Sequence, residues 1–374
     1  MRKMRIAIIS TFYGKNFGGA EISAKILADG LQRKRHNITV LSTKKSDYGT
    51  YSINFLRFIP KKLIILGSTI LDKMLESQIS HYLEGYKPDI IHVQDLFVLP
   101  ATVKAAKKRK IPILVTIRDE LPRTYSIFGY NLLSNRNLTY KESLTKCDLV
   151  ISISHFIKNS LVKFGINPKK IKVIYNIPPR WKFKKEITKE KKDNFILAPG
   201  RLFKEKGFEV VIRSLRLVVR EIPNVKLIII GDGPEKANLT ALIKIYHLED
   251  NVNIINKVPN NKIHDYFKKC SLVVFTPIYN EPLGRVAIEA AISKKPIVAT
   301  NVGGIPEIVL DGKTGILVKP NRVDQLSNAI LKLLKNPILS DNIGKNGYNY
   351  ITKNLNENML LDKTIRTYNQ FRAK

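Results

Sequence analysis

Cysteine is scarce in this chain of 374 residues, which contains only Cys147 and Cys270. Two cysteines are too few for a disulfide framework or a zinc site, so small proteins held together by disulfides or by a zinc ion are excluded. The two stand in similar contexts, Lys-Cys-Asp-Leu-Val-Ile and Lys-Cys-Ser-Leu-Val-Val. We interpret both as small buried packing residues just before a strand. The shared context suggests two domains that are built alike.

Long apolar runs are also missing. One of the longest, residues 63–71, is closed by charged residues on both sides, and it is far shorter than the roughly 20 apolar residues of a membrane-spanning helix. The apolar run at residues 6–9 is too short for a secretory signal and lacks a small-residue cleavage site. It predicts the first strand of the fold. The protein is therefore expected to be cytoplasmic.

Acidic residues are few relative to basic ones. The chain has 64 Lys and Arg against 31 Asp and Glu, a formal net charge of +33. Residues 1–180 hold 31 basic and 12 acidic side chains, or +19, and residues 181–192 hold 6 and 2, or +4. This excess favours contact with an anionic surface, either lipid headgroups on the cytoplasmic face of a membrane or nucleic acid. A lysine-rich coding bias is the alternative, although such a bias usually raises glutamate as well.

The basic residues are not interleaved with aromatic ones as they are in proteins that bind single strands, so nucleic acid is not favoured as a partner. The densest basic segment is residues 104–110, with five charges in seven residues. We interpret it as a solvated helix end, with phospholipid as a candidate contact.

The length and the alternation of elements indicate two α/β domains. A chain of 374 residues is too long for one ordinary core. Strands alternate with helices twice over, which predicts two Rossmann-like, doubly wound parallel sheets facing across a cleft. Residues 178 to about 193 carry prolines, the only tryptophan and many lysines, with little apolar periodicity. We therefore place a linker at residues 179–193, between a first domain (1–178) and a second (194–356).

The stretch from Thr276 to Glu307 is the most informative part of the second domain. It follows an apolar run at residues 272–275 that predicts a buried parallel strand, and residues 283–292 then carry apolar side chains at helical spacing. A helix that starts at the carboxyl end of a strand presents unpaired N–H groups and the positive end of its dipole, which suits a diphosphate. Glu281 and Glu289 could accept hydrogen bonds from sugar and ribose hydroxyls. The alternative is a solvated helix face.

Two cations follow the strand predicted to begin at residue 195. Arg201 and Lys206 leave the same loop, which glycines at positions 200 and 207 enclose. A guanidinium and an ammonium in one loop can clamp two phosphates, the first bidentately and the second as a point charge. An exposed basic loop without a ligand is the alternative.

The first loop of the first domain contains Gly18, Gly19 and Glu21, between the first strand and a helix expected at residues 20–32. Two glycines at this place let the backbone approach a ligand at the helix N-terminus. An ordinary tight turn is the alternative.

Charged residues follow two further strands of the first domain. Asp95 comes after the strand predicted at residues 89–93, and Arg118 and Asp119 come after the strand predicted at residues 113–117. Because ligands bind beyond the carboxyl ends of strands in open α/β sheets, these side chains are candidates for a second substrate site. For Arg118 and Asp119 a structural ion pair is the alternative.

These motifs resemble those of the family-4 retaining glycosyltransferases. The resemblance is carried by Asn-Glu-Pro-Leu-Gly-Arg-Val-Ala-Ile-Glu at residues 280–289, Gly-Gly-Ile-Pro-Glu at 303–307, Gly-Arg-x4-Lys-Gly at 200–207 and Gly-Gly-Ala-Glu at 18–21. It covers essentially the whole chain and is strongest from residue 195 to 320. It implies the GT-B architecture, a nucleotide-sugar donor and retention of the anomeric configuration. It also implies that a C-terminal helix, about 357–374, crosses back onto the first domain.

The resemblance further implies roles for individual residues. The expected catalytic residues are Arg201, Lys206 and Glu281. The donor would be bound by side chains or backbone of Gly18, Gly19, Arg201, Lys206, Lys257, Val258, Glu281, Leu283, Gly284, Arg285 and Glu289. The acceptor-side candidates are Glu21, Asp95, Arg118 and Asp119. The resemblance implies His-Asp at this place in most members of the family, so Arg118 is a departure that puts in question a mechanism that needs an imidazole there. The chain has no Asp-x-Asp motif, so no metal and no cofactor are expected.

The expected reaction is transfer of a sugar from a nucleotide-diphosphate sugar to a hydroxyl of a lipid-linked or saccharide acceptor, such as a precursor of a cell-envelope glycan. Two alternatives stay open. One is a sugar-nucleotide epimerase of the same architecture, which would need no acceptor. The other is a basic protein that binds nucleic acid or an anionic surface.

Overall fold

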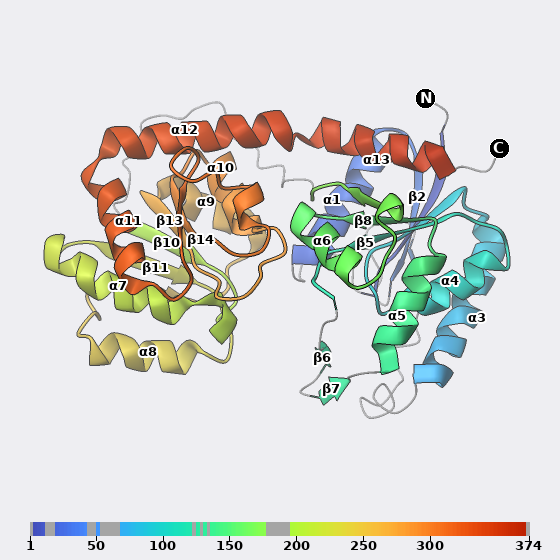
Figure 1. Cartoon of the computed structure of the whole chain (residues 1–374), viewed down its shortest axis with the longest axis horizontal. Helices are drawn as coiled ribbons and strands as arrows, with labels where there is room; N and C mark the ends of the chain where they lie inside the picture. The colour runs from blue at the N-terminus through green and yellow to red at the C-terminus, as the bar shows by residue number, and fades with distance from the viewer. Residues whose placement is uncertain are drawn as a thin grey trace. The chain divides into compact units, whose positions relative to one another are not determined.

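The computed structural model describes residues 3–11, 19–42, 50–52, 68–121, 125–127, 130–132, 135–176 and 195–371. The chain forms two compact units (Figure 1). Unit 1 comprises Met1–Ile177 together with Glu357–Lys374, and unit 2 comprises Pro178–Asn356. The last helix therefore belongs to the same unit as the first strand. The linker predicted at residues 179–193 lies outside the described residues.

Within the described residues, unit 1 contains a parallel sheet of seven strands: β1 (Arg5–Ile9), β2 (Asn37–Ser42), β3 (Thr50–Ser52), β4 (Ile90–Val93), β5 (Ile113–Ile117), β8 (Leu149–Ser152) and β9 (Ile171–Val173). Their order in the sheet is β3-β2-β1-β4-β5-β8-β9, and Ile6 of β1 lies opposite Ile38 and Ile90. All residues of β4, β5 and β8 are buried. Strands that are mostly apolar and buried at every residue are typical of parallel sheets covered on both faces.

Helices flank this sheet (Figure 1). They are α1 (Gly19–Arg33), α3 (Ser68–Tyr86), α4 (Leu99–Lys107), α5 (Asn135–Lys146), α6 (His155–Lys163), the 3-10 helix η2 (Pro168–Lys170) and α13 (Glu357–Phe371). A small antiparallel hairpin of β6 (Tyr125–Ile127) and β7 (Tyr130–Leu132) precedes α5. Ser154 caps α6, because its side-chain oxygen accepts a hydrogen bond from the backbone N–H of Ile157 at 3.1 Å.

From residue 195 onward, unit 2 shows a parallel sheet of six strands: β10 (Phe195–Pro199), β11 (Lys226–Ile230), β12 (Val252–Ile255), β13 (Leu272–Phe275), β14 (Ile297–Thr300) and β15 (Ile316–Val318). Its strand order is β12-β11-β10-β13-β14-β15. The helices are η3 (Lys204–Lys206), α7 (Phe208–Glu221), α8 (Lys236–Ile245), α9 (Asn260–Lys269), α10 (Arg285–Ile292), η4 (Ile305–Glu307), α11 (Val323–Lys335) and α12 (Pro337–Asn354). On α7 the buried residues Phe208, Val211, Ile212, Leu215 and Val218 follow the helical period and pack into the core.

Both sheets have the same doubly wound plan. In each, the first strand is interior, the second and third strands extend to one side, and the fourth and fifth extend to the other. The prediction of two Rossmann-like parallel sheets is confirmed. The two cysteines, however, do not precede equivalent strands. Cys270 precedes β13, which adjoins β10, whereas Cys147 precedes β8, which β4 and β5 separate from β1.

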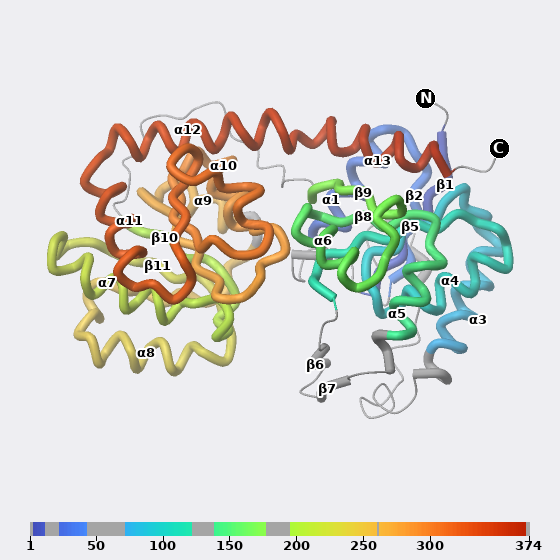
Figure 2. Tube along the Cα trace, viewed as in Figure 1, coloured from blue at the N-terminus to red at the C-terminus, as the bar shows by residue number. Residues whose placement is uncertain are grey.

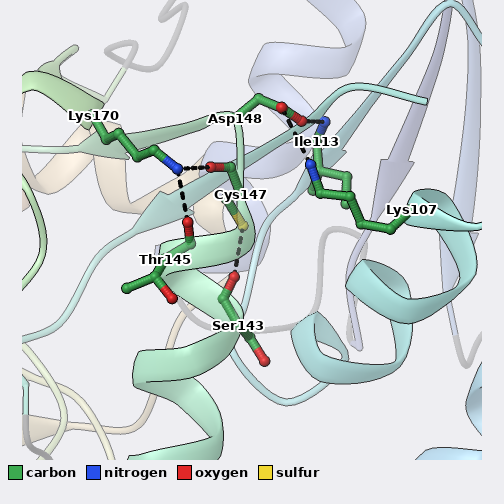
Figure 3. Close-up of polar contacts among 7 residues, drawn as sticks. All are labelled: Lys107, Ile113, Ser143, Thr145, Cys147, Asp148 and Lys170. Carbon is green, nitrogen blue, oxygen red and sulfur yellow. Dashed lines mark hydrogen bonds and ion pairs between the residues drawn. The ribbon is translucent and has the colours of Figure 1, made fainter. Parts of the chain in front are cut away.

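Both cysteines are buried packing residues, as predicted. Burial raises the pKa of each thiol to about 12, so both are protonated at neutral pH. Around Cys147, the Lys170 ammonium donates to the carbonyls of Thr145 (2.7 Å) and Cys147 (3.2 Å), at the end of α5 (Figure 3). In unit 2 the buried ammonium of Lys295 donates to the carbonyl of Cys270 at 2.7 Å. In each unit a lysine thus satisfies carbonyls that the helix end leaves unpaired.

The basic segment at residues 104–110 lies at the end of α4 and is largely paired with acids of its own unit. The pairs are Lys107 with Asp148, Lys108 with Glu76, and Arg109 with Glu84. Figure 3 shows the first pair, in which Asp148 also accepts a hydrogen bond from the backbone N–H of Ile113. Surface pairs of this kind add little stability, but they cancel much of the local positive charge. Contact of this segment with phospholipid stays a prediction.

Helix α13 packs beside α1 (Figure 2). A Cβ atom added to Gly30 of α1 would lie only 2.6 Å from Cδ2 of Leu361, so the two helices approach closely where Gly30 has no side chain. Lys34, directly after α1, forms an ion pair with Asp362 of α13 at 2.9 Å. The buried side of α13 comprises Leu360, Leu361, Thr364, Ile365, Thr367 and Tyr368. The C-terminal helix is therefore part of the core of unit 1.

A buried polar chain joins α13 to the centre of the sheet. His92 of β4 lies 2.6 Å from the Tyr368 hydroxyl through Nδ1 and 2.6 Å from Oγ1 of Thr116 through Nε2. Burial, and secondarily the nearby Arg118 guanidinium, lowers the pKa of His92 to about 3. The imidazole is therefore neutral at physiological pH, and both of its nitrogens have partners.

The low pKa of His92 makes the stability of unit 1 sensitive to acid. The folded pKa, about 3, lies below the ordinary value of 6.5, so the unfolded state binds more protons between these pH values. The contribution of neutral His92 to the free energy of unfolding is fully present above pH 6.5. It is lost as the pH falls, by up to about 1.4 kcal/mol per pH unit. In urea unfolding from pH 7 to pH 4.5, His92→Gln should show a shallower loss of stability than the wild type. The exposed His155, changed to Gln, should keep the wild-type slope, and equal slopes in all three proteins would contradict the prediction.

Candidate functional site

The site residues predicted in unit 2 gather at one edge of its sheet. Arg201 follows β10, Lys257 and Val258 follow β12, and Glu281 follows β13. All of these strands are parallel, so their carboxyl ends meet at the edge where open α/β sheets bind ligands.

The loop that carries Lys206 docks on the segment that follows β13. The backbone N–H of Ile278 donates to the carbonyl of Glu205 at 2.9 Å, and Oγ1 of Thr276 donates to the carbonyl of Gly207 at 3.2 Å. Gly207 has φ +70°, and a Cβ atom there would lie 2.0 Å from the Thr276 carbonyl oxygen. Only glycine fits at this position. The close approach of the Gly207 and Thr276 backbones determines which residues the Lys206 side chain can contact.

Lys206 reaches Glu281 and Tyr279. Its ammonium lies 2.8 Å from Oε2 of Glu281 and 2.7 Å from the Tyr279 hydroxyl, which also donates to Oε2. The side chains of Lys206 and Glu281 are only 13% and 14% exposed. An exposed basic loop is therefore the wrong description for Lys206. Sequence reasoning missed Tyr279, although an aromatic residue two positions before Glu281 was a visible signal.

Helix α10 begins at Arg285, two residues later than the apolar spacing from residue 283 predicted. The reason is Gly284, whose φ of +89° is left-handed and cannot continue a helix. Leu283 is buried, and the first N–H groups of α10 have no acceptor within the helix. The diphosphate site predicted at the backbone of Leu283 and Gly284 therefore lies directly before the first turn of α10, and it stays a prediction.

Glu289 lies inside α10 on its buried side and is 8% exposed. Its Oε1 accepts a hydrogen bond from Nε of Arg285 at 2.8 Å. Neither Glu281 nor Glu289 lies on a solvated helix face, so that alternative is wrong. Arg285, which was predicted to contact the donor, orients Glu289 in this structure.

The Gly303-Gly304 turn braces the backbone of Glu281. The N–H of Gly304 donates to the carbonyl of Glu281 at 2.8 Å. A Cβ atom on Gly303 would lie 2.1 Å from that same carbonyl oxygen, and one on Gly304 would lie 2.3 Å from the carbonyl oxygen of Pro282. The two glycines of this motif are therefore required because two backbone segments touch.

Arg201 is exposed, and its guanidinium lies 5.1 Å from the centre of the Phe203 ring. The backbone of its loop is held by the loop after β11, since the N–H of Leu202 donates to the carbonyl of Asp232 at 2.9 Å. Lys257 is exposed and Val258 is partly buried. The site thus combines one exposed cation, Arg201, with one partly buried cation, Lys206, on the same loop.

In unit 1, Asp95 fixes a loop. Its carboxylate accepts hydrogen bonds from the backbone N–H of Thr11 (2.6 Å), the Thr11 hydroxyl (2.7 Å) and the backbone N–H of Phe97 (3.1 Å). These contacts hold the ends of β1 and β4 together. They account for Asp95 without a substrate, and its role on the acceptor side stays a prediction.

Arg118 likewise contacts its own unit. Its guanidinium donates to the backbone carbonyl (2.8 Å) and the side-chain oxygen (2.6 Å) of Gln94. Asp119 is partly buried. Gly19 is the first residue of α1, and Glu21 lies in the same helix. Gly18 and the side chain of Glu21 lie outside what the structure describes.

Within the described residues, no group of three or more His, Cys, Asp or Glu side chains is placed to hold a metal ion. In the same residues no helix is long and apolar enough to cross a membrane. The acidic groups of the unit 2 site are instead paired with cations of the chain itself, Lys206 and Arg285.

The two doubly wound sheets and the polar groups at their carboxyl edge define a protein of the GT-B class. Residues 17–177 match the family "Glycosyltransferase Family 4", and residues 179–350 match the family "Glycosyl transferases group 1". The chain belongs to the family-4 glycosyltransferases of GT-B fold, and it is a transferase of that kind.

Curated relatives are similar over most of their length. The N-acetyl-alpha-D-glucosaminyl L-malate synthase of Bacillus anthracis is 27% identical over 73% of this chain and 72% of its own. The capsular polysaccharide biosynthesis glycosyltransferase CapM of Staphylococcus aureus is 24% identical over 91% of this chain and 92% of its own. Among solved structures, HepE of Anabaena in complex with UDP-glucose superposes with a TM-score of 0.78 at 22% identity, over 98% of this chain and 100% of that one.

Proposed function

We propose that this glycosyltransferase transfers a sugar, with retention of anomeric configuration, from a nucleotide-diphosphate sugar bound by unit 2 to a hydroxyl acceptor bound by unit 1. The observation that supports it most strongly is the meeting of Lys206 and Glu281. These residues are 75 positions apart in the sequence, and their side chains lie 2.8 Å apart at the carboxyl edge of the sheet, close to the start of α10 in the sequence.

Each group has a role in this proposal that its chemistry allows. The leaving diphosphate gains negative charge in the transition state, and Arg201, Lys206 and the N–H groups of α10 would stabilise that charge. Glu289 would accept a hydrogen bond from the ribose, and Glu281 one from the sugar. The loop of Lys257 and Val258 would contact the base through its backbone. No step requires a metal ion or a cofactor, which stays an expectation.

The donor can be identified by thermal shift. Purified protein is heated with UDP-, GDP- and ADP-sugars, each with EDTA and with Mg²⁺, because ligand binding to the folded state raises Tm by mass action. The UDP-glucose in the HepE complex makes UDP-sugars the first to test. We expect one base to raise Tm equally with EDTA and with Mg²⁺. The shift should disappear in Arg201→Ala and persist in Lys204→Ala, which removes an exposed cation from the same loop. No shift with any nucleotide sugar would contradict the proposal.

The acceptor and the stereochemistry need a second experiment. We propose a lipid-linked or saccharide acceptor of the kind used in glycan assembly, because the relatives include a capsular polysaccharide glycosyltransferase. Product made from the bound donor and an acceptor panel should have the same anomeric configuration as the donor in NMR spectra. Inversion would contradict retention. A new sugar nucleotide formed from the donor alone would indicate an epimerase.

The net charge of +33 supports docking on an anionic membrane surface to reach such an acceptor. In a flotation experiment the protein should rise with vesicles of anionic phospholipid at low salt and should not rise with neutral vesicles. Absence from the anionic vesicles at low salt would reject docking. Steeply salt-dependent RNA binding without nucleotide-sugar binding would instead favour a nucleic-acid-binding protein.

A further inference from the structure

Tyr279, Lys206 and Glu281 form a closed triangle of hydrogen bonds in unit 2. The Lys206 ammonium donates to the Tyr279 hydroxyl (2.7 Å) and to Oε2 of Glu281 (2.8 Å), and the Tyr279 hydroxyl donates to the same Oε2. The ammonium also lies 4.6 Å from the centre of the Tyr279 ring. The tyrosine therefore holds the lysine both through its hydroxyl and through its ring.

The triangle uses most, but not all, of the hydrogen-bonding capacity of the two charged groups. A lysine ammonium has three N–H donors, of which two are occupied by Tyr279 and Glu281. A carboxylate has two oxygens, and both contacts fall on Oε2. Among the described residues, nothing donates to Oε1 of Glu281. One N–H of Lys206 and one oxygen of Glu281 are thus left for a substrate.

The backbone around the triangle is fixed as well. The backbone N–H of Ile278, directly before Tyr279, donates a hydrogen bond to the carbonyl of Glu205, directly before Lys206, at 2.9 Å. The carbonyl of Glu281 is bonded to the N–H of Gly304 at 2.8 Å. With the backbone held on both sides, the Tyr279 hydroxyl and the Lys206 ammonium are the two groups that hold Oε2 of the carboxylate.

We propose that Tyr279 is a positioning residue of the transferase site. Its hydroxyl turns the Glu281 carboxylate so that Oε1 faces the sugar hydroxyls, while Lys206 keeps its remaining N–H for the diphosphate. The inference rests on the proposed function. It adds a residue whose hydroxyl acts mainly on recognition of the sugar, because Glu281 and the ring of Tyr279 still hold Lys206 when the hydroxyl is removed.

The test compares two ligands that differ only in the sugar. Isothermal titration calorimetry gives the Kd of UDP and of UDP-glucose, or of the matching pair for the base that the thermal-shift screen selects. In Tyr279→Phe, which keeps the ring and removes the hydroxyl, the ratio Kd(UDP)/Kd(UDP-glucose) should fall about tenfold, the size expected for losing a hydrogen bond to a charged group. The Kd of UDP should change by less than about twofold.

Two controls separate positioning from general damage. Tyr246→Phe also removes a hydroxyl from a tyrosine whose ring faces a cation, since the Arg216 guanidinium lies 5.0 Å from its ring centre, and it should leave the ratio unchanged. In a Glu281→Ala background, Tyr279→Phe should have no further effect on the ratio, because Tyr279 acts through Glu281.

The outcomes distinguish the inference from the proposed function. Equal weakening of UDP and UDP-glucose in Tyr279→Phe would mean that the loop is disturbed as a whole, and an unchanged ratio would mean that Tyr279 does not orient the carboxylate. Either result overturns the inference while the donor assignment holds. A wild-type protein that binds neither ligand of any pair overturns the proposed function and the inference together.

Discussion

Lys206→Ala should lower the turnover of the transferase by about 10²- to 10³-fold, the usual cost of removing one preorganised charge from the stabilisation of a developing anion. The Lys206 side chain is only 13% exposed, so the charge at its end is only weakly screened by water. The same substitution leaves the carboxylate of Glu281 without its only ion-pair partner among the described residues. Turnover with saturating donor measures the first effect, and donor KM measures the second.

The control for Lys206→Ala lies two positions away. Lys204 is exposed on the same 3-10 helix, so Lys204→Ala removes the same charge from the loop at a place that water screens. We expect Lys204→Ala to keep turnover within about twofold of the wild type. Turnover that falls equally in both variants would show that the overall charge of the loop matters and not the position of Lys206.

Gly303→Ala should lower turnover by about 10²-fold while unit 2 stays folded. Gly303 has φ +57°, and the added Cβ atom would lie 2.1 Å from the carbonyl oxygen and 2.7 Å from the backbone nitrogen of Glu281. These contacts are with backbone and not with a flexible side chain, so the backbone of Glu281 must move. A displacement of about 1 Å in a positioned catalytic group costs on the order of 10²-fold in rate.

Gly312→Ala is the control, because it introduces backbone strain without the steric overlap that Gly303→Ala creates. Gly312 has a similar φ of +69°, but a Cβ atom there would meet nothing within 4 Å. It should lower the free energy of unfolding by only about 1 kcal/mol and leave turnover unchanged. Activity and Tm measured on both variants decide the matter, and full activity in Gly303→Ala would contradict the expectation.

Much of the fold follows from local sequence pattern. The apolar runs at residues 113–117 and 272–275 predict β5 and β13 because a parallel strand covered on both faces has no polar side. The start of α10 was misplaced by two residues because Leu283 continues the apolar spacing, whereas the left-handed Gly284 stops the helix. Periodicity reports which side chains are apolar and does not report a backbone angle.

The contacts of the site depend on approaches between distant segments, and a sequence does not encode these in any short pattern. Lys206 was expected to face phosphate alone, but Gly207 lets its loop reach the segment after β13, where Tyr279 and Glu281 stand. The sequence leaves open an ion pair between Arg118 and Asp119. In the structure the Arg118 guanidinium donates hydrogen bonds to Gln94, which follows the neighbouring strand β4. His92 is hydrogen-bonded to Tyr368, which lies 276 residues away in the sequence.

The place of α13 has a consequence for synthesis of the chain. Domains generally fold as they leave the ribosome, the N-terminal one first. Here Tyr368 and its neighbours, which complete the core of unit 1, are made only after all of unit 2. Unit 2 can finish folding before them, whereas the unit that starts first is completed last. A chain truncated before α13 would therefore leave the apolar side chains of unit 1 that pack against Leu361, Ile365 and Tyr368 without their cover, and unit 1 can close only after unit 2 has been synthesised.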